Sequence, residues 1–73
     1  MEGYKMLEAL KKMYEAEVAL AKANVQVYLK SPVGIGEHPD LVSAVDGQID
    51  KIAHAEDKLE VLKKHYNGNL SVS

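Results

Sequence analysis

Apolar residues recur along two long segments of the chain in alternating steps of three and four, which is the spacing of one helical face. The stripe of the first segment, residues 4–30, consists of Met6, Leu10, Met13, Glu17, Leu20, Asn24 and Val27. The stripe of the second segment, residues 39–66, consists of Leu41, Val45, Gln48, Ile52, Ala55, Leu59, Leu62 and Tyr66. The two stripes predict two amphipathic helices with a repeat close to that of a coiled coil.

The residues at the ends of these segments indicate the helix boundaries. Pro32 disfavours helical geometry in the residue before it, so the first helix should end near residue 30. Pro39 suits the first position of the second helix, and Asp40 adds negative charge near the positive end of the helix dipole. Three basic residues at 63–65 complement the other end, where Gly68 is expected to adopt a left-handed closing conformation.

Two helices of similar length predict an all-α fold, an antiparallel two-helix hairpin. We expect a single domain over residues 1–73, with an inter-helix loop at 31–38 and a frayed tail at 67–73. A chain of 73 residues buries little apolar surface, and it has no cysteine that could form a disulfide or a thiolate metal site. We therefore expect the hairpin to self-associate into a helical bundle.

A second apolar column of the first helix supports this expectation. It lies beside the first stripe and consists of Leu7, Tyr14, Ala21 and Tyr28. An isolated hairpin buries only its seam, the line along which the two helices pack, so these four residues are predicted to form the interface between copies. Alanines at 9, 16 and 23 on the other side of the stripe would permit close helix approach. The alternative is a monomeric hairpin whose flank rests on another protein.

Three polar residues interrupt the predicted seam: Glu17, Asn24 and Gln48. Carboxylates from facing helices can hold a metal in a bundle core, but a di-metal site needs several of them and usually a Glu-x-x-His pair. This seam has one glutamate and no histidine. We predict instead that the three residues set helix register and oligomeric state, as single buried amides do in coiled coils.

His54 has the most suggestive neighbours of the three histidines, because Asp50 lies four residues before it on one helical face. A His–Asp pair can hold a metal ion. Two ligands on an exposed helix make a weak site, however, and a solvated charged face is the favoured interpretation. No histidine has a serine or cysteine in an evident geometry for nucleophilic catalysis. The sequence predicts no metal site, no cofactor and no enzymatic activity.

The connector has an unusually specific composition for a turn. Its glycines at 34 and 36 resemble a phosphate-binding loop, but no strand precedes them, and Glu37 and Asp40 would repel phosphate. A metal held by Glu37, His38 and Asp40 fits the charges with low specificity. We favour a structural cap in which the apolar loop residues cover the open end of the hairpin. Recognition of a protein partner is the alternative, with Ile35, Glu37, His38 and Asp40 as candidate binding residues.

The charge balance excludes some classes of partner. Nine basic and eleven acidic side chains give a formal net charge of −2, without the basic patch of a nucleic-acid-binding protein. The first residues are charged and contain no continuous apolar run, so we expect neither a signal peptide nor a membrane span. These features predict a cytoplasmic protein that binds neither nucleic acid nor membrane.

The run VGIGEHPD at residues 33–40 and the helix IDKIAHAEDKLEVLKKHY that follows resemble a known group of proteins. These are small, uncharacterised helical proteins of large contractile-tailed phages of marine bacteria, including cyanophages, and the similarity covers residues 4 to 66. The resemblance implies a phage accessory or structural protein, located in the host cytoplasm or in the virion. It implies no catalytic residues.

Two functions remain open at this level. The first is a non-enzymatic interaction or scaffolding protein that acts through homo-oligomerisation and binding of a protein partner. The alternative is a small ligand- or metal-responsive regulator that uses the loop residues Glu37, His38 and Asp40.

Overall fold

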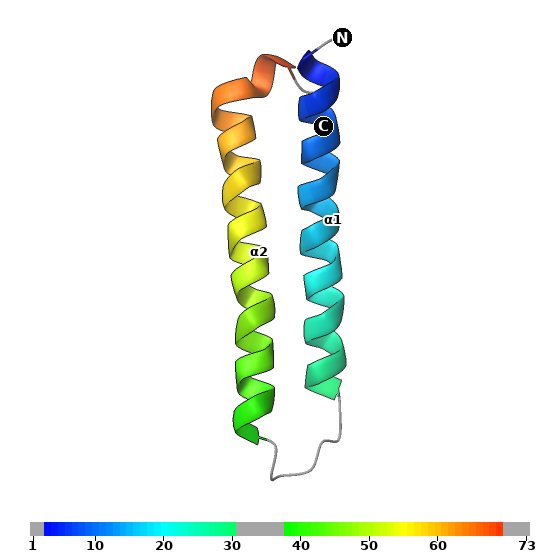
Figure 1. The fold of residues 1–73 in the computed structure, drawn as a ribbon, viewed down its shortest axis with the longest axis vertical. Helices are drawn as coiled ribbons and strands as arrows, with labels where there is room; N and C mark the ends of the chain where they lie inside the picture. The colour runs from blue at the N-terminus through cyan, green and yellow to red at the C-terminus, as the bar shows by residue number, and fades with distance from the viewer. Residues whose placement is uncertain (1–2, 31–37, 70–73) are drawn as a thin grey trace.

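The computed structural model describes residues 3–30 and 38–69, which form two long helices and one short turn. Helix α1 covers Gly3–Lys30, helix α2 covers His38–Tyr66, and a 3-10 turn, η2, covers Asn67–Asn69. The helices run antiparallel and side by side along their whole length (Figure 1). The predicted all-α hairpin is confirmed, and its helices begin one residue earlier than expected.

The charges at the ends of α2 are placed as the sequence predicts. Asp40 lies in the first turn, and Lys63, Lys64 and His65 lie in the last turn. The predicted closing conformation of Gly68 is wrong, because no described glycine has a positive φ. Gly68 belongs instead to η2, which continues the chain in a right-handed sense beside the start of α1 (Figure 1). Of the tail expected over residues 67–73, η2 covers residues 67–69, and residues 70–73 lie outside the described part.

The hairpin is a single layer of two helices with a small core. Its extents are 52 × 20 × 15 Å, and since one helix with its side chains is about 10 Å thick, both broad faces of the layer are molecular surface. Only Ala21, Ala55 and Leu62 are buried apolar residues in the described segments. The chain exposes 5532 Å², whereas a compact monomer of this mass exposes about 4,500 Å². The single chain thus leaves an unusual amount of its surface uncovered.

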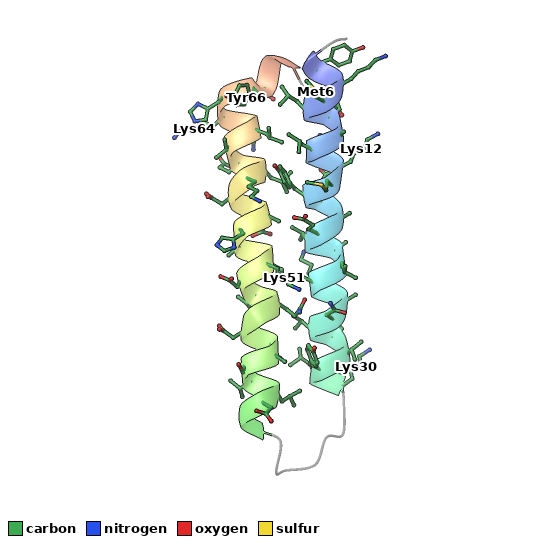
Figure 2. The ribbon with its side chains drawn as sticks, in the orientation of Figure 1. Met6, Lys12, Lys30, Lys51, Lys64 and Tyr66 are labelled. Carbon is green, nitrogen blue, oxygen red and sulfur yellow. The ribbon has the colours of Figure 1, made fainter. Side chains whose placement is uncertain are left out.

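The seam on α2 is the predicted one, apart from its last residue. Seven of the eight stripe residues are buried or half-buried, and they are Leu41, Val45, Gln48, Ile52, Ala55, Leu59 and Leu62. Tyr66 is 45% exposed. Lys64 projects from the opposite side of α2, away from α1 (Figure 2).

The seam on α1 is not the predicted one, because the helix is rotated about its axis. The residues of α1 that are buried or half-buried are Leu7, Glu8, Leu10, Lys11, Tyr14, Val18, Ala21, Asn24, Val25 and Tyr28. Ala21 is only 2% exposed, and the Lys58 Nζ from α2 lies 5.3 Å from the centre of the Tyr14 ring. The column expected to form the interface between copies, Leu7, Tyr14, Ala21 and Tyr28, therefore packs within the chain, and its assignment to the flank was wrong.

The predicted stripe of α1 lies largely on the surface. Met6, Met13, Leu20 and Val27 are 59%, 47%, 65% and 64% exposed, respectively. A seam centred on that stripe would have enclosed Glu17, and burying an unpaired carboxylate is costly. In the observed rotation Glu17 is exposed and the half-buried Val18 takes its place in the seam. Lys12 and Lys30 project from the side of α1 that faces away from α2 (Figure 2).

Candidate interaction surface

A continuous apolar stripe runs along the exposed side of α1, next to the seam. We call it the α1 stripe, and it consists of Met6, Ala9, Met13, Ala16, Leu20, Ala23 and Val27. The steps between its members alternate between three and four, which is the spacing by which one helix packs against another. All seven residues are exposed in the single chain, and none is polar. The α1 stripe is therefore a second packing surface that α2 does not cover.

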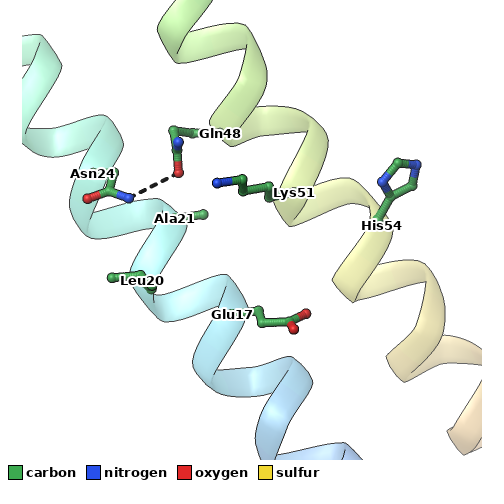
Figure 3. Close-up of a pocket in the computed structure, with 7 residues that line it drawn as sticks. All are labelled: Glu17, Leu20, Ala21, Asn24, Gln48, Lys51 and His54. Atoms are coloured by element: carbon green, nitrogen blue, oxygen red, sulfur yellow. Dashed lines mark hydrogen bonds between the residues drawn. The ribbon is translucent and has the colours of Figure 1, made fainter.

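A groove of about 370 Å³ lies between the helices beside this stripe (Figure 3). Its lining comprises Glu17, Leu20, Ala21 and Asn24 from α1, and Gln48, Lys51 and His54 from α2. Leu20 belongs both to this lining and to the α1 stripe. The groove and the stripe therefore share one broad face of the hairpin. Its α2 side is polar, whereas its α1 side combines the apolar stripe with Glu17 and Asn24.

The predicted polar residues of the seam meet in this groove. Asn24 Nδ2 donates a hydrogen bond of 3.2 Å to Gln48 Oε1, and both amides are partly buried (Figure 3). Because one amide comes from each helix, a shift of either helix along the other would break the bond. Glu17 lies on the same groove but is exposed. The structure thus brings together two of the three residues, and their effect on register stays a prediction.

The His54 face of α2 is a solvated surface. His54 Nδ1 and Asp50 Oδ2 are 3.8 Å apart, and the two side chains are 72% and 68% exposed. That distance is too long for a hydrogen bond. Within residues 3–30 and 38–69 there is no group of three or more histidine, cysteine, aspartate or glutamate residues that could hold a metal ion.

The candidate binding loop is described only at its end. Ile35 and Glu37 lie outside the described residues, so the prediction of a cap or a partner-binding loop is not tested. His38 begins α2, and Asp40 is exposed in its first turn.

A second apolar patch lies at the loop end of the hairpin. A depression of about 280 Å³ is lined by Tyr28, Leu29, Leu41, Val42 and Val45. Leu29 and Val42 are 68% and 66% exposed. Since Leu29 follows Val27 by two residues, it points about 200° away from it around the helix. The patch therefore lies on the broad face opposite to the α1 stripe.

Sequence reasoning missed the α1 stripe as a surface because it assigned four of its residues to the seam. The signal was present in the alanines at 9, 16 and 23, which together with Met6, Met13, Leu20 and Val27 form an unbroken apolar repeat.

Neither described helix contains a stretch that is long and apolar enough to cross a lipid bilayer.

Comparisons of the chain with protein-family models, with curated proteins and with solved structures find no match.

Proposed function

We propose that this chain is a non-enzymatic helical interaction module that associates with other helices, first of all with those of its own copies. The observation that carries the proposal is the α1 stripe, a helix-packing repeat that the hairpin leaves exposed along the length of α1.

The apolar surface of the stripe is large in comparison with the core of the hairpin. Three buried apolar residues, two of them alanines, make up the core of the described segments. Covering the four large side chains of the stripe would contribute roughly 1 to 1.5 kcal/mol each, since each is about half to two-thirds exposed. Two copies would together gain on the order of 10 kcal/mol, which is comparable with the cost of association. We therefore expect association that is reversible and depends on concentration.

The shape of the hairpin suits a scaffolding role. The hairpin extends over 52 Å, and it presents the α1 stripe on one face and the apolar patch around Leu29 and Val42 on the other. Pairing through one face leaves the second patch available to a protein partner. A thin rod of this kind can join other components through its two faces.

Sedimentation equilibrium over a wide range of concentration tests the proposal. We expect a dimer or a larger species at high concentration, and a melting temperature that rises with protein concentration because folding and association are linked. A stable monomer at every concentration, with an unchanged melting temperature, would contradict the proposal.

The phage origin, and the location in host cytoplasm or virion that it implies, rest on the resemblance over residues 4–66 alone. Mass spectrometry of purified phage particles and of the lysate of infected cells would test both.

A further inference from the structure

We infer that the α1 stripe is covered by the α1 stripe of a second copy of this chain, with the two helices antiparallel about a two-fold axis that crosses α1 between Ala16 and Leu20. This inference rests on the proposed function, because it names the partner and the geometry of the association proposed there.

The sizes of the stripe residues favour this arrangement. The stripe combines a column of large residues with a column of alanines. In an antiparallel pair of helices, each layer brings a residue of one column opposite a residue of the other column, and with this axis Leu20 faces Ala16, Met13 faces Ala23 and Val27 faces Ala9. In a parallel pair, each column would face itself, and layers of two large side chains would alternate with layers of two alanines. Close packing without voids favours the antiparallel pair.

The two-fold symmetry makes the stripe its own partner. An isologous interface uses the same patch on both subunits, and the stripe runs nearly evenly to both sides of its middle, from Met6 to Val27. An occupant of a different kind would need a matching alternation of large and small residues, whereas a second copy has it by necessity.

The area of the stripe is sufficient for a specific contact. Its four large side chains are 47% to 65% exposed, and a pair that covers them in both copies approaches the lower end of the range for stable interfaces, about 1,200 Å². On the opposite face, the exposed large apolar residues of α2 run only from Val42 to Ile49, so the patch there offers less contact length.

Cysteine cross-linking tests the orientation. The chain has no cysteine, so single cysteines introduced as Ala9→Cys and Ala23→Cys report proximity without a background. The two variants are unfolded, mixed, refolded and treated with a short bis-maleimide. We expect the mixed 9–23 product to form at least tenfold faster than either homotypic product. Preferential 9–9 and 23–23 products would overturn the inference in favour of a parallel pair.

A matched pair of lysine substitutions tests the surface. Leu20 in the stripe and Leu29 on the opposite face are equally exposed, at 65% and 68%. We expect Leu20→Lys to raise the dissociation constant of the dimer by about a hundredfold or more, because a central interface residue becomes charged in both copies. Leu29→Lys should leave the dissociation constant within a fewfold of the original, and far-ultraviolet circular dichroism should show helix in both.

The outcomes separate the inference from the proposed function. A wild-type chain that is monomeric at every concentration would refute both the inference and the proposed function. A wild-type dimer that survives Leu20→Lys and dissociates with Leu29→Lys would overturn the inference and leave the proposed function standing. If Leu20→Lys loses helix as it dissociates, the cross-linking pattern, which is measured on the folded dimer, decides.

Discussion

The hydrogen bond between Asn24 and Gln48 allows a quantitative test of how the two helices hold their register. We consider three variants, Asn24→Leu, Gln48→Leu and the double variant, each compared with the parent chain at one fixed protein concentration. Asn24 donates to Gln48 over 3.2 Å at the seam, and both residues are half-buried.

The expected free energies follow from two opposing terms. Each leucine gains about 1 kcal/mol from apolar burial at a half-buried position. Loss of the hydrogen bond costs about 1 kcal/mol, and the first substitution already incurs the whole of this cost. Each single variant should therefore unfold with nearly the parent free energy, whereas the double variant should be more stable by about 1 kcal/mol. The resulting coupling of about 1 kcal/mol is the contribution of the hydrogen bond.

Urea unfolding followed by circular dichroism measures these differences. Gln26→Leu is the matched control, because Gln26 is exposed on α1 and its replacement should change the stability by less than about 0.5 kcal/mol. Additive effects of Asn24→Leu and Gln48→Leu, within about 0.3 kcal/mol, would refute the reasoning. If the amide pair also selects one assembly, the double variant should sediment as a broader distribution of species than the parent, since apolar pairs specify register less strictly.

Three further predictions follow from the packing of α1. Ala21→Lys should unfold the hairpin itself, because Ala21 is 2% exposed and a buried, unpaired charge is strongly destabilising. Circular dichroism measures the loss of helix. A folded variant would argue against the observed rotation of α1. Lys58→Ala should lower the stability by about 0.5 to 1 kcal/mol in the parent chain through loss of the contact with the Tyr14 ring, and by much less in a Tyr14→Leu background, as measured by urea unfolding. Zinc or nickel ions added at micromolar concentration should leave the melting temperature unchanged in the parent chain and in His54→Ala alike, because His54 and Asp50 belong to no group of three potential ligands within the described residues; a metal-dependent rise that His54→Ala removes would show a site.

The features of this protein that depend on local chemistry follow from the amino-acid sequence alone. Pro32 and Pro39 act on the backbone of their immediate neighbours, so the ends of the helices were predictable to within one residue. Helix α2 has one dominant apolar stripe, so its seam was also predictable, with Ala55 and Leu62 buried as expected.

The side of α1 that faces α2 depends on how the two helices pack together. Helix α1 carries two adjacent apolar columns with the same seven-residue period, one through Met13 and one through Tyr14, and the period alone does not rank them. The choice depends on the side chains of α2 that face α1 and on the residues of α1 that each rotation places in the seam. The observed rotation places Val18 in the seam and leaves Glu17 exposed to water. The candidate interaction surface follows from the same choice, because the column that α2 does not cover is the one left for a partner.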